Sequence, residues 1–392
     1  MDEALSSGSD DERLMALACR LALRGKGKTR PNPLVGAVLV KDGGLIGTGY
    51  HKGPGLPHAE VIAIRNATER PEGSTLYVNL EPCAHFGRTP PCVDLILASS
   101  IRRVVIGTLD PNPKVNGKSM GMLRDHGVEV TCGVREAACR RLNEVFFKFI
   151  ETSSPFVTLK AAVSLDGKIA SWSGRSKWIS CEASRKRVHR LRSEADAILV
   201  GIGTVLQDDP ALTVRGVPGR AKPLRVVLDS RLRIPLEARV LGPEAPTLVA
   251  TTEQAPAEKV RLLRDRGIGV EVFAPDRKGR VPLAALLSRL GQREVQHLLI
   301  EGGGEVHTAA LEEKVADKLM LFVAPLLLGG REAPSFFSGQ GADDPARAYA
   351  VREMRALKSD RDILLEGYLG PVPTRPIREA VSGCPGVRQA KP

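Results

Sequence analysis

The sequence lacks long apolar runs and has few aromatic residues. Phe, Trp and Tyr together make up 4% of its 392 residues. No stretch approaches the roughly 20 consecutive apolar residues that a transmembrane helix needs. Residues 1–11 are acidic and rich in Ser and Gly, and they lack the apolar core of a signal peptide. These absences predict a cytoplasmic protein that does not contact a membrane.

A disulfide framework is not expected either, because the seven cysteines are odd in number and widely scattered. In a reducing compartment, clustered cysteines are better interpreted as metal ligands. Isolated cysteines and histidines are more often structural than ligating, since a free thiol usually behaves as a small buried hydrophobe. We give that interpretation to Cys19, Cys132, Cys139, Cys181, Cys384, His126, His189 and His297.

Dense basic segments are also missing. The net charge is +12, but the Lys and Arg residues are spread along the whole chain. With few aromatic side chains to stack on bases, the sequence does not favour a nucleic-acid partner. A basic balance of this kind suits small anionic ligands such as phosphates.

The length predicts two domains, because domains usually contain about 100–200 residues. Both halves alternate helical and strand patterns, which predicts the α/β class for each. We place the domains at residues 11–150 and 156–368, with residues 151–155 (ETSSP) as a short linker. Residues 1–10 and the Pro- and Arg-rich residues 369–392 are expected to be disordered.

The periodicity of apolar residues predicts the elements of each half. In the first half, helices are expected at 11–24, 58–69, 92–99 and 136–149, and strands at 34–40, 45–50, 75–80 and 103–107. In the second half, strands are expected at 156–163, 197–200, 224–228, 247–251, 268–273, 297–300 and 319–323, and helices at 184–193, 257–266, 283–290 and 305–312.

The strongest motif is His58-Ala59-Glu60 followed by Pro82-Cys83 and Cys92. One His and two Cys form a three-ligand set that leaves a fourth tetrahedral position for water, as in a catalytic zinc site. Zinc lowers the pKa of such a water to about 7. Glu60 lies near the start of a helix and can carry the proton without ligating the metal. This arrangement of His, Glu and two Cys is typical of zinc nucleobase deaminases. His85 is interpreted as lining the cleft, because a fourth protein ligand would close the site.

Eight residues separate Cys83 from Cys92, instead of the usual two, and this insertion is informative. LEPCAHFGRTPPC (80–92), PNPLVGAVLV (31–40), GYH (49–51) and DPNPKVNG (110–117) closely resemble the deaminase domain of the RibD family of riboflavin biosynthesis enzymes. The resemblance implies a cytidine-deaminase-like α/β/α fold, zinc held by His58, Cys83 and Cys92, and Glu60 as the catalytic proton carrier. It also implies a substrate cleft lined by Asn32, His51, Arg88, Asp110 and Asn112.

No strand of the second half is followed by the G-x-G-x-x-G pattern of a Rossmann cofactor site. Two glycine-rich turns, 201–206 and 301–305, do follow expected strands. Each is either an anion site at a helix N-terminus or only a tight turn. LKAAVSLDGKIA (159–170), SKWIS (176–180), GIGTVLQDDPALTVR (201–215), VVLDS (226–230) and IEGGGEV (300–306) resemble the RibD reductase domain. That resemblance implies a dihydrofolate-reductase-like α/β fold.

The same resemblance implies residues for two ligands of the second domain. NADPH would contact Ala162, Trp178, Thr204, Asp208, Ser230, Gly303, Gly304, Glu305, Val306, His307, Thr308 and Ala309. The substrate would contact Ser176, Arg192, Leu212, Arg215 and Glu301. Preference for NADPH over NADH stays open, because no cationic cluster is evident beyond Ser230 and Arg231. Lys160 and Asp166 are expected to have a structural or cleft role, but no specific one is assigned. Asp208 is either the reductase proton donor or part of a turn that ends a helix.

Arginine at two of these positions has a physical rationale, since guanidinium groups bind phosphate in a bidentate manner. For Arg215 the rationale rests on a strand-like run at 211–215, in which alternation would place Thr213 and Arg215 on the face opposite Leu212 and Val214. Surface solvation is the alternative for both Arg192 and Arg215.

The family resemblance implies a bifunctional enzyme. It would hydrolytically deaminate 2,5-diamino-6-(5-phosphoribosylamino)pyrimidin-4(3H)-one with zinc, then reduce the ribosyl chain with NADPH to give 5-amino-6-(5-phosphoribitylamino)uracil. We also expect a homo-oligomer. One alternative is a zinc deaminase of nucleosides or tRNA with an unrelated second domain, which the long insertion opposes. The other is a binding or regulatory protein with one degenerate domain, which the intact zinc motif opposes.

Overall fold

The computed structural model describes residues 9–86, 90–113, 115–217 and 222–371. The chain divides into two compact units, of which the first extends to Phe147 and the second runs from Lys148 to Pro371. The predicted disordered termini lie almost entirely outside the described residues. None of the helices in the described part of the chain has both the length and the apolar character needed to span a membrane.

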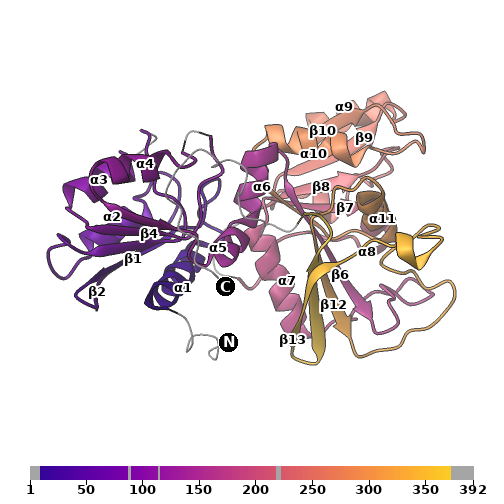
Figure 1. Ribbon diagram of the computed structural model, residues 1–392. Helices are drawn as coiled ribbons and strands as arrows, with labels where there is room; N and C mark the ends of the chain where they lie inside the picture. Colours follow the sequence, from indigo (N-terminus) through magenta and orange to yellow (C-terminus); the bar gives the residue numbers. More distant parts are fainter. Residues whose placement is uncertain (1–8, 87–89, 114, 218–221, 372–392) are drawn as a thin grey trace. The chain divides into compact units, whose positions relative to one another are not determined.

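The first unit contains a five-stranded sheet with the order β2-β1-β3-β4-β5 (Figure 1). β1 is antiparallel to β2 and β3, whereas β3, β4 and β5 are parallel. Its strands are β1 (Gly36–Lys41), β2 (Gly44–Tyr50), β3 (Thr75–Val78), β4 (Arg103–Ile106) and β5 (Glu129–Cys132). Its helices are α1 (Asp10–Ala22), α2 (Ala59–Arg65), α3 (Cys92–Ala98), α4 (Lys118–Asp125), α5 (Glu136–Leu142) and α6 (Glu144–Thr152), the last of which crosses into the second unit.

Helices cover both faces of this sheet, which confirms the expected α/β/α arrangement. Alternation along β3 sends Leu76 to one core, where it packs with Ala63 of α2 and Ile96 of α3. It sends Tyr77 to the opposite core, which Met15 of α1 shares. Because α2 and α3 carry the residues of the zinc motif, the first of these cores fixes the position of that motif.

The glycines of β2 allow α2 to lie directly on the sheet. A Cβ atom at Gly49 would come within 2.2 Å of the Ala59 carbonyl oxygen, and one at Gly47 within 2.3 Å of the Ala63 carbonyl oxygen. No side chain fits at such distances without moving the helix. These two glycines therefore set how closely the helix that follows His58 approaches the strand.

Three predictions for the first unit differ from the structure. The helix expected at 136–149 is two helices, because the chain breaks at Asn143, whose side-chain amide bonds both the N–H and the C=O of Leu34. The sequence reading also missed α4 and β5. Helix α1 begins at Asp10, one residue before the predicted start. The side chain of Ser9 caps it by accepting a hydrogen bond from the Glu12 N–H.

The second unit is built on a nine-stranded sheet with the order β10-β9-β8-β7-β11-β6-β12-β14-β13. The seven strands from β10 to β12 in this order are parallel, and β14 and β13 add an antiparallel edge. The strands are β6 (Phe156–Ser164), β7 (Ala197–Gly201), β8 (Leu224–Leu228), β9 (Thr247–Thr252), β10 (Gly269–Phe273), β11 (His297–Ile300), β12 (Lys318–Ala324), β13 (Arg352–Ser359) and β14 (Asp362–Tyr368). The helices are α7 (Glu182–Glu194), α8 (Ile202–Asp208), α9 (Ala257–Asp265), α10 (Leu283–Gln292) and α11 (Gly304–Glu312).

This sheet also has a core on each face. Alternation along β7 places Leu199 in a core with Leu287 of α10, and Ile198 in a core with Leu263 of α9. The carboxyl ends of the parallel strands β6, β7, β8 and β11 meet at one edge, which is where ligands bind in open α/β sheets. The predicted α/β fold is confirmed, although α8, β13 and β14 were not predicted.

Candidate active sites

The zinc motif forms a compact cluster in the first unit. The ligand atoms of His58, Cys83 and Cys92 all lie within 4.8 Å of one another. His58 Nδ1 is 3.2 Å from Cys92 Sγ and 3.5 Å from Cys83 Sγ. Donors around a tetrahedral zinc, with Zn–S near 2.3 Å and Zn–N near 2.0 Å, are about 3.5 Å apart. The three side chains therefore fit a single zinc ion.

Two helix N-termini position these ligands. His58 is the residue before α2, and Cys92 is the first residue of α3. The Cys92 N–H donates a hydrogen bond to Cys83 Sγ at 3.2 Å. Hydrogen bonds from the Cys92 thiol and the His58 ring, together with that N–H, lower the pKa of the Cys83 thiol to about 4. The thiolate is the form that ligates metals, so the local structure favours metal binding.

Glu60 projects a carboxylate into the same site. Its side chain is 3% exposed, and its Oε2 atom is buried without a hydrogen-bond partner among the described residues. Burial raises the pKa of this carboxyl group. Glu60 lines a cavity of about 380 Å³ together with His58 and Cys83, yet its oxygens are not part of the three-atom metal cluster. An unpartnered buried oxygen beside three metal ligands is suited to receive a proton.

Four of the predicted substrate residues line this cavity. They are Asn32, His51, Asp110 and Asn112. The fifth, Arg88, lies outside the described residues. His85 also lines the cavity and is not part of the metal cluster.

The hydrogen bonds of His51 define its tautomer. Burial lowers the pKa of the ring, which keeps it neutral. Nδ1 faces the Pro57 carbonyl at 3.2 Å and therefore carries the proton, so Nε2 accepts from the Asn32 amide at 3.0 Å. This contact leaves the amide oxygen of Asn32 as the acceptor that can face a ligand.

Glu81 is a site residue that sequence reasoning missed. It is almost fully buried, and it accepts hydrogen bonds from the N–H groups of Asp110 at 3.2 Å and Gly117 at 2.9 Å and from Ser119 Oγ at 2.6 Å. Asp110, whose pKa burial raises to about 6, in turn accepts from the Asn112 N–H. Glu81 thus attaches the loop that carries two predicted substrate residues to the segment that carries Cys83. The sequence did offer a signal for Glu81, because this acidic residue lies between an apolar strand and the Pro82-Cys83 pair.

A second cavity, of about 470 Å³, lies at the carboxyl edge of the second sheet. It brings together four of the predicted cofactor residues, Ser230, Glu305, Val306 and Ala309. Gly201 and Gly203 line it as well, so both glycine-rich segments contribute. Most of the predicted cofactor residues at 303–309 belong to α11, which begins at Gly304, and the start of that helix faces the cavity.

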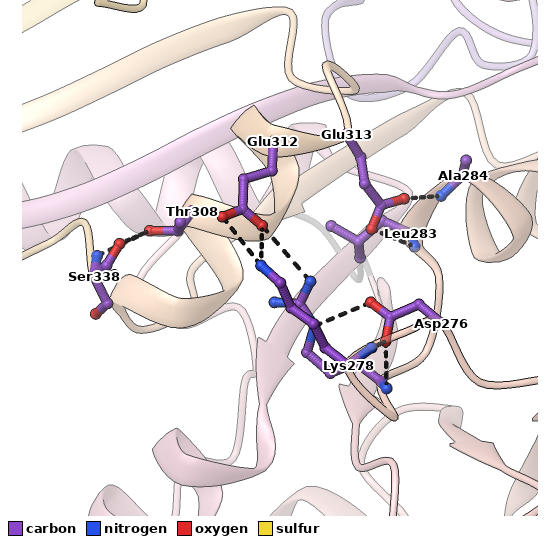
Figure 2. A network of polar contacts seen from close by, with 9 residues as sticks. Asp276, Lys278, Leu283, Ala284, Thr308, Glu312, Glu313 and Ser338 are labelled. Atoms are coloured by element: carbon purple, nitrogen blue, oxygen red, sulfur yellow. Dashed lines mark hydrogen bonds and ion pairs between the residues drawn. The ribbon is translucent and has the colours of Figure 1, made fainter. Parts of the chain in front are cut away.

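The other predicted cofactor residues do not line this cavity. A Cβ atom at Gly303 would lie 4.0 Å from Thr204 Oγ1, so these two residues are neighbours. The His307 ring is buried with Nδ1 against the Phe336 carbonyl, and Thr308 Oγ1 donates to the Ser338 carbonyl (Figure 2). Gly304, Ala162, Trp178 and Asp208 complete this group. Their cofactor roles remain predictions.

Glu301, at the end of β11, holds two cations. Its carboxylate accepts from Arg192 Nε at 2.6 Å and from Lys160 Nζ at 3.2 Å. Burial raises the pKa of Glu301, but the charges of Arg192 and Lys160 outweigh it and lower the pKa to about 2. Arg192 also donates to the Thr213 carbonyl. The sequence analysis predicted that Arg192 binds a phosphate and assigned no specific role to Lys160. In the structure both side chains form ion pairs with Glu301.

This buried ion-pair cluster leads to a stability prediction. Glu301→Gln should lower the free energy of unfolding of the second unit by roughly 3–5 kcal/mol, because it leaves two part-buried cations, each with a side chain only 14% exposed, without a counter-charge. The folded-state pKa lies below the ordinary value of 4.5. The difference between wild type and variant should therefore be complete above about pH 4.5 and shrink as the pH falls toward 2.

Urea unfolding measures this effect selectively, since both tryptophans of the chain, Trp172 and Trp178, belong to the second unit. The matched control is Glu182→Gln, which removes an exposed ion pair with Lys186 and should cost less than about 1 kcal/mol. Equal effects of the two variants would contradict a buried network.

The prediction of a strand-like segment at 211–215 is wrong, because these residues form an irregular loop. Leu212 has a positive φ of 49° and its side chain is buried in a core. The N–H of Arg215 donates to His189 Nδ1 at 3.2 Å. Alternation therefore gives no support for Arg215 in the cleft, and the substrate roles of Arg215 and Leu212 remain predictions. Ser176 bonds Asp208 Oδ1 at 2.9 Å, which joins a predicted substrate residue to a predicted cofactor residue at the end of α8.

Comparison with known proteins matches both units. Residues 8–108 match the cytidine and deoxycytidylate deaminase zinc-binding region, and residues 155–365 match the RibD C-terminal domain. The riboflavin biosynthesis protein RibD of Aquifex aeolicus is 49% identical over 320 residues, covering 81% of this chain and 88% of the relative. The corresponding protein of Escherichia coli is 39% identical over 331 residues, covering 81% and 89%.

Solved structures agree along nearly the whole chain. Acinetobacter baumannii RibD superposes with a TM-score of 0.80 at 39% identity, covering 91% of this chain and 98% of that one. The deaminase and reductase of Thermotoga maritima superposes with a TM-score of 0.78 at 38% identity and the same coverage. The expected cytidine-deaminase-like and dihydrofolate-reductase-like folds are thereby confirmed. The chain belongs to the RibD family and is a bifunctional enzyme of riboflavin biosynthesis, with a zinc-binding deaminase unit followed by a reductase unit of the NADPH-dependent type.

Proposed function

We propose that His58, Cys83 and Cys92 hold the zinc and that Glu60 carries the proton of the deamination step. The observation that supports this most directly is the buried, unpartnered Oε2 atom of Glu60 in the cavity that also contains His58 and Cys83. Zinc supplies, when bound, the Lewis acidity that makes water a nucleophile at neutral pH. Glu60 takes a proton from the attacking water and delivers it to the amino nitrogen that leaves as ammonia.

The remaining cavity residues orient the pyrimidine. Asn32 is held by His51, so that its amide oxygen can accept from an amino or ring N–H of the substrate. Asp110 and Asn112 lie on the loop that Glu81 anchors, and they face the same cavity. The substrate proposed for this site is 2,5-diamino-6-(5-phosphoribosylamino)pyrimidin-4(3H)-one, which loses its 2-amino group.

In the second unit, Ser230 and the first turn of α11 hold the cofactor, and the Glu301 cluster binds the sugar phosphate. NADPH supplies, when bound, a hydride for C1′ of the ribosyl group, which opens the ring. Lys160 and Arg192 together carry one positive charge more than Glu301 neutralises, which favours an anionic substrate. The product would be 5-amino-6-(5-phosphoribitylamino)uracil.

A two-signal assay of the zinc-loaded protein tests this function. Ammonia release from the diaminopyrimidine should proceed without NADPH, and the loss of NADPH absorbance should require the deaminated compound. Ammonia release from cytidine or from tRNA in place of the diaminopyrimidine would instead support a nucleoside or tRNA deaminase.

We further propose that the chain self-associates and works in the cytoplasm. The edge strand β13 exposes Met354 and Leu357, and Ile363 of the neighbouring strand β14 is also exposed. Exposed apolar side chains on an edge strand favour pairing with another surface. Sedimentation equilibrium at micromolar concentration would contradict self-association if only monomer is found. The cytoplasmic location follows from the need for reduced Cys83 and Cys92, and cell fractionation tests it.

A further inference from the structure

His189 of α7 contacts the loop that carries two of the predicted substrate residues of the second unit. Its Nδ1 atom accepts the main-chain N–H of Arg215 at 3.2 Å. Three residues further along the same helix, Arg192 Nη1 donates to the Thr213 carbonyl at 3.2 Å. Positions three apart are neighbours on a helix surface, so one face of α7 holds this loop at two points. The sequence alone predicts only a structural role for His189.

The first part of this loop has anchors of its own. Arg225 of β8, whose side chain is fully buried, donates from Nη1 to the Ala211 carbonyl at 3.3 Å. The next side chain along the loop, Leu212, is buried in a core. His189 holds the far end of the loop, and it therefore fixes the main chain at Arg215 itself.

The His189 ring lies among the charged side chains of the Glu301 cluster. Burial lowers the pKa of the ring. Nearby cations lower this pKa further, and they are Arg192, Arg215 and Lys160. The carboxylate of Glu301 acts in the opposite sense. Since charges shift a pKa mainly at short range, the Arg215 guanidinium is close to the cluster, and three cations against one carboxylate favour an anion there.

The hydrogen bond from the Arg215 N–H requires a neutral His189 ring. An imidazole nitrogen accepts only when it carries no proton, and the lowered pKa keeps the ring neutral at pH 7. Because Nδ1 is the acceptor, the single proton of the neutral ring is on Nε2. Protonation of Nδ1 would place two N–H groups face to face and release the Arg215 end of the loop.

We infer that His189 is a positioning residue of the reductase unit, which places Arg215 against the substrate phosphate through Nδ1 and releases it when the ring is protonated. This rests on the proposed binding of the sugar phosphate at the Glu301 cluster and on the predicted substrate role of Arg215. His189 acts through the loop and not on the reacting atoms. A contact that is equally strong in the ground state and the transition state changes KM and leaves kcat unchanged.

Steady-state reduction of the deaminated compound by the zinc-loaded protein tests this inference at about pH 8. His189→Ala should raise the KM of that compound about three- to tenfold, the range expected for one hydrogen bond, and leave kcat and the KM of NADPH within about twofold. His189→Asn should restore the substrate KM, because the amide oxygen of Asn can replace Nδ1 as the acceptor. His189→Gln places its amide nearer the position of Nε2 and should behave like His189→Ala.

The same assay at lower pH tests the release of the loop. The substrate KM of wild type should rise as the pH falls below 6.5, the ordinary pKa of histidine, which this site lowers. His189→Asn should lack this part of the rise, because an amide does not titrate. Ionisation of the substrate phosphate affects both proteins alike, so the comparison of the two cancels it. Identical pH dependence of wild type and His189→Asn would overturn the inference.

The matched control is Arg190→Gln, a change at the next position of α7, which is exposed. It should leave every constant at the wild-type value, and tryptophan fluorescence checks that each variant is folded. An unchanged substrate KM in folded His189→Ala, or an equal rise in the KM of NADPH, would overturn the inference. A KM of His189→Asn no lower than that of His189→Gln would overturn it too, since Nδ1 would then not be the atom that matters. Absence of any reduction by wild type would instead overturn the proposed function itself.

Discussion

Glu60→Gln should abolish measurable deamination while the protein keeps its zinc. Gln preserves the shape of the side chain but cannot accept a proton. General acid–base groups contribute about 10²- to 10⁴-fold, and here one group serves both the proton removal and the proton delivery. We therefore expect a loss at or beyond the upper end of that range, measured as ammonia release. Zinc content by elemental analysis should remain at the wild-type ratio, because the three ligand atoms do not include Glu60.

The control for this variant is Glu72→Gln, which removes an exposed carboxylate of the same unit outside the cavity. It should deaminate at the wild-type rate. A fall in zinc content that parallels the fall in activity of Glu60→Gln would make Glu60 a ligand and contradict its role as proton carrier.

Cys83→Ala and Cys92→Ala should each lose zinc and deaminase activity together. Two remaining ligands cannot hold the metal in the geometry that three provide, and the Cys83 sulfur also accepts the N–H that begins α3. Reduction of supplied deaminated intermediate should continue, because each hydrophobic core among the described residues lies within one unit. Elemental analysis and the loss of NADPH absorbance measure the two outcomes separately.

Cys132→Ala is the matched control, since Cys132 is a thiol of the same unit outside the metal cluster. It should retain zinc and both activities. If either ligand variant also loses reductase activity, tryptophan fluorescence distinguishes unfolding of the second unit from a direct effect. Loss of reduction by a folded second unit would contradict independent function of the two units.

The zinc site could be predicted from sequence because its information is local and chemical. His58 and Glu60 are two residues apart, and the residue types themselves specify metal ligation and proton transfer. Short apolar runs such as β7 and β11 were equally accessible, since a buried parallel strand is apolar on both faces. In these cases the local sequence is enough to predict the feature, and the structure adds only the distances between its atoms.

The charged residues that line the second cavity come together through contacts that no local sequence pattern encodes. Arg231 and Lys278 come from distant segments, and only the pairing of β8, β9 and β10 brings those segments to one edge. The ion pairs of Arg192 and Lys160 could not be predicted for the same reason. Neither residue has a local sequence signal for an ion pair, and the partner of both, Glu301, follows β11 far along the chain. β13 was missed because nearly all its residues are exposed, so no alternation of apolar and polar residues marks it.

The strand order of the second unit has a consequence for synthesis on the ribosome. β11 lies between β7 and β6 at the centre of the sheet, yet it is made only after β6, β7, β8, β9 and β10. Until residue 300 leaves the ribosome, β6 and β7 have no common neighbour, and their apolar edges stay unpaired. The first unit makes its sheet from contiguous sequence before residue 133, and domains generally fold in the order of synthesis. Nascent chains should therefore acquire protease resistance in two steps, with a long interval in which the second unit is vulnerable to aggregation.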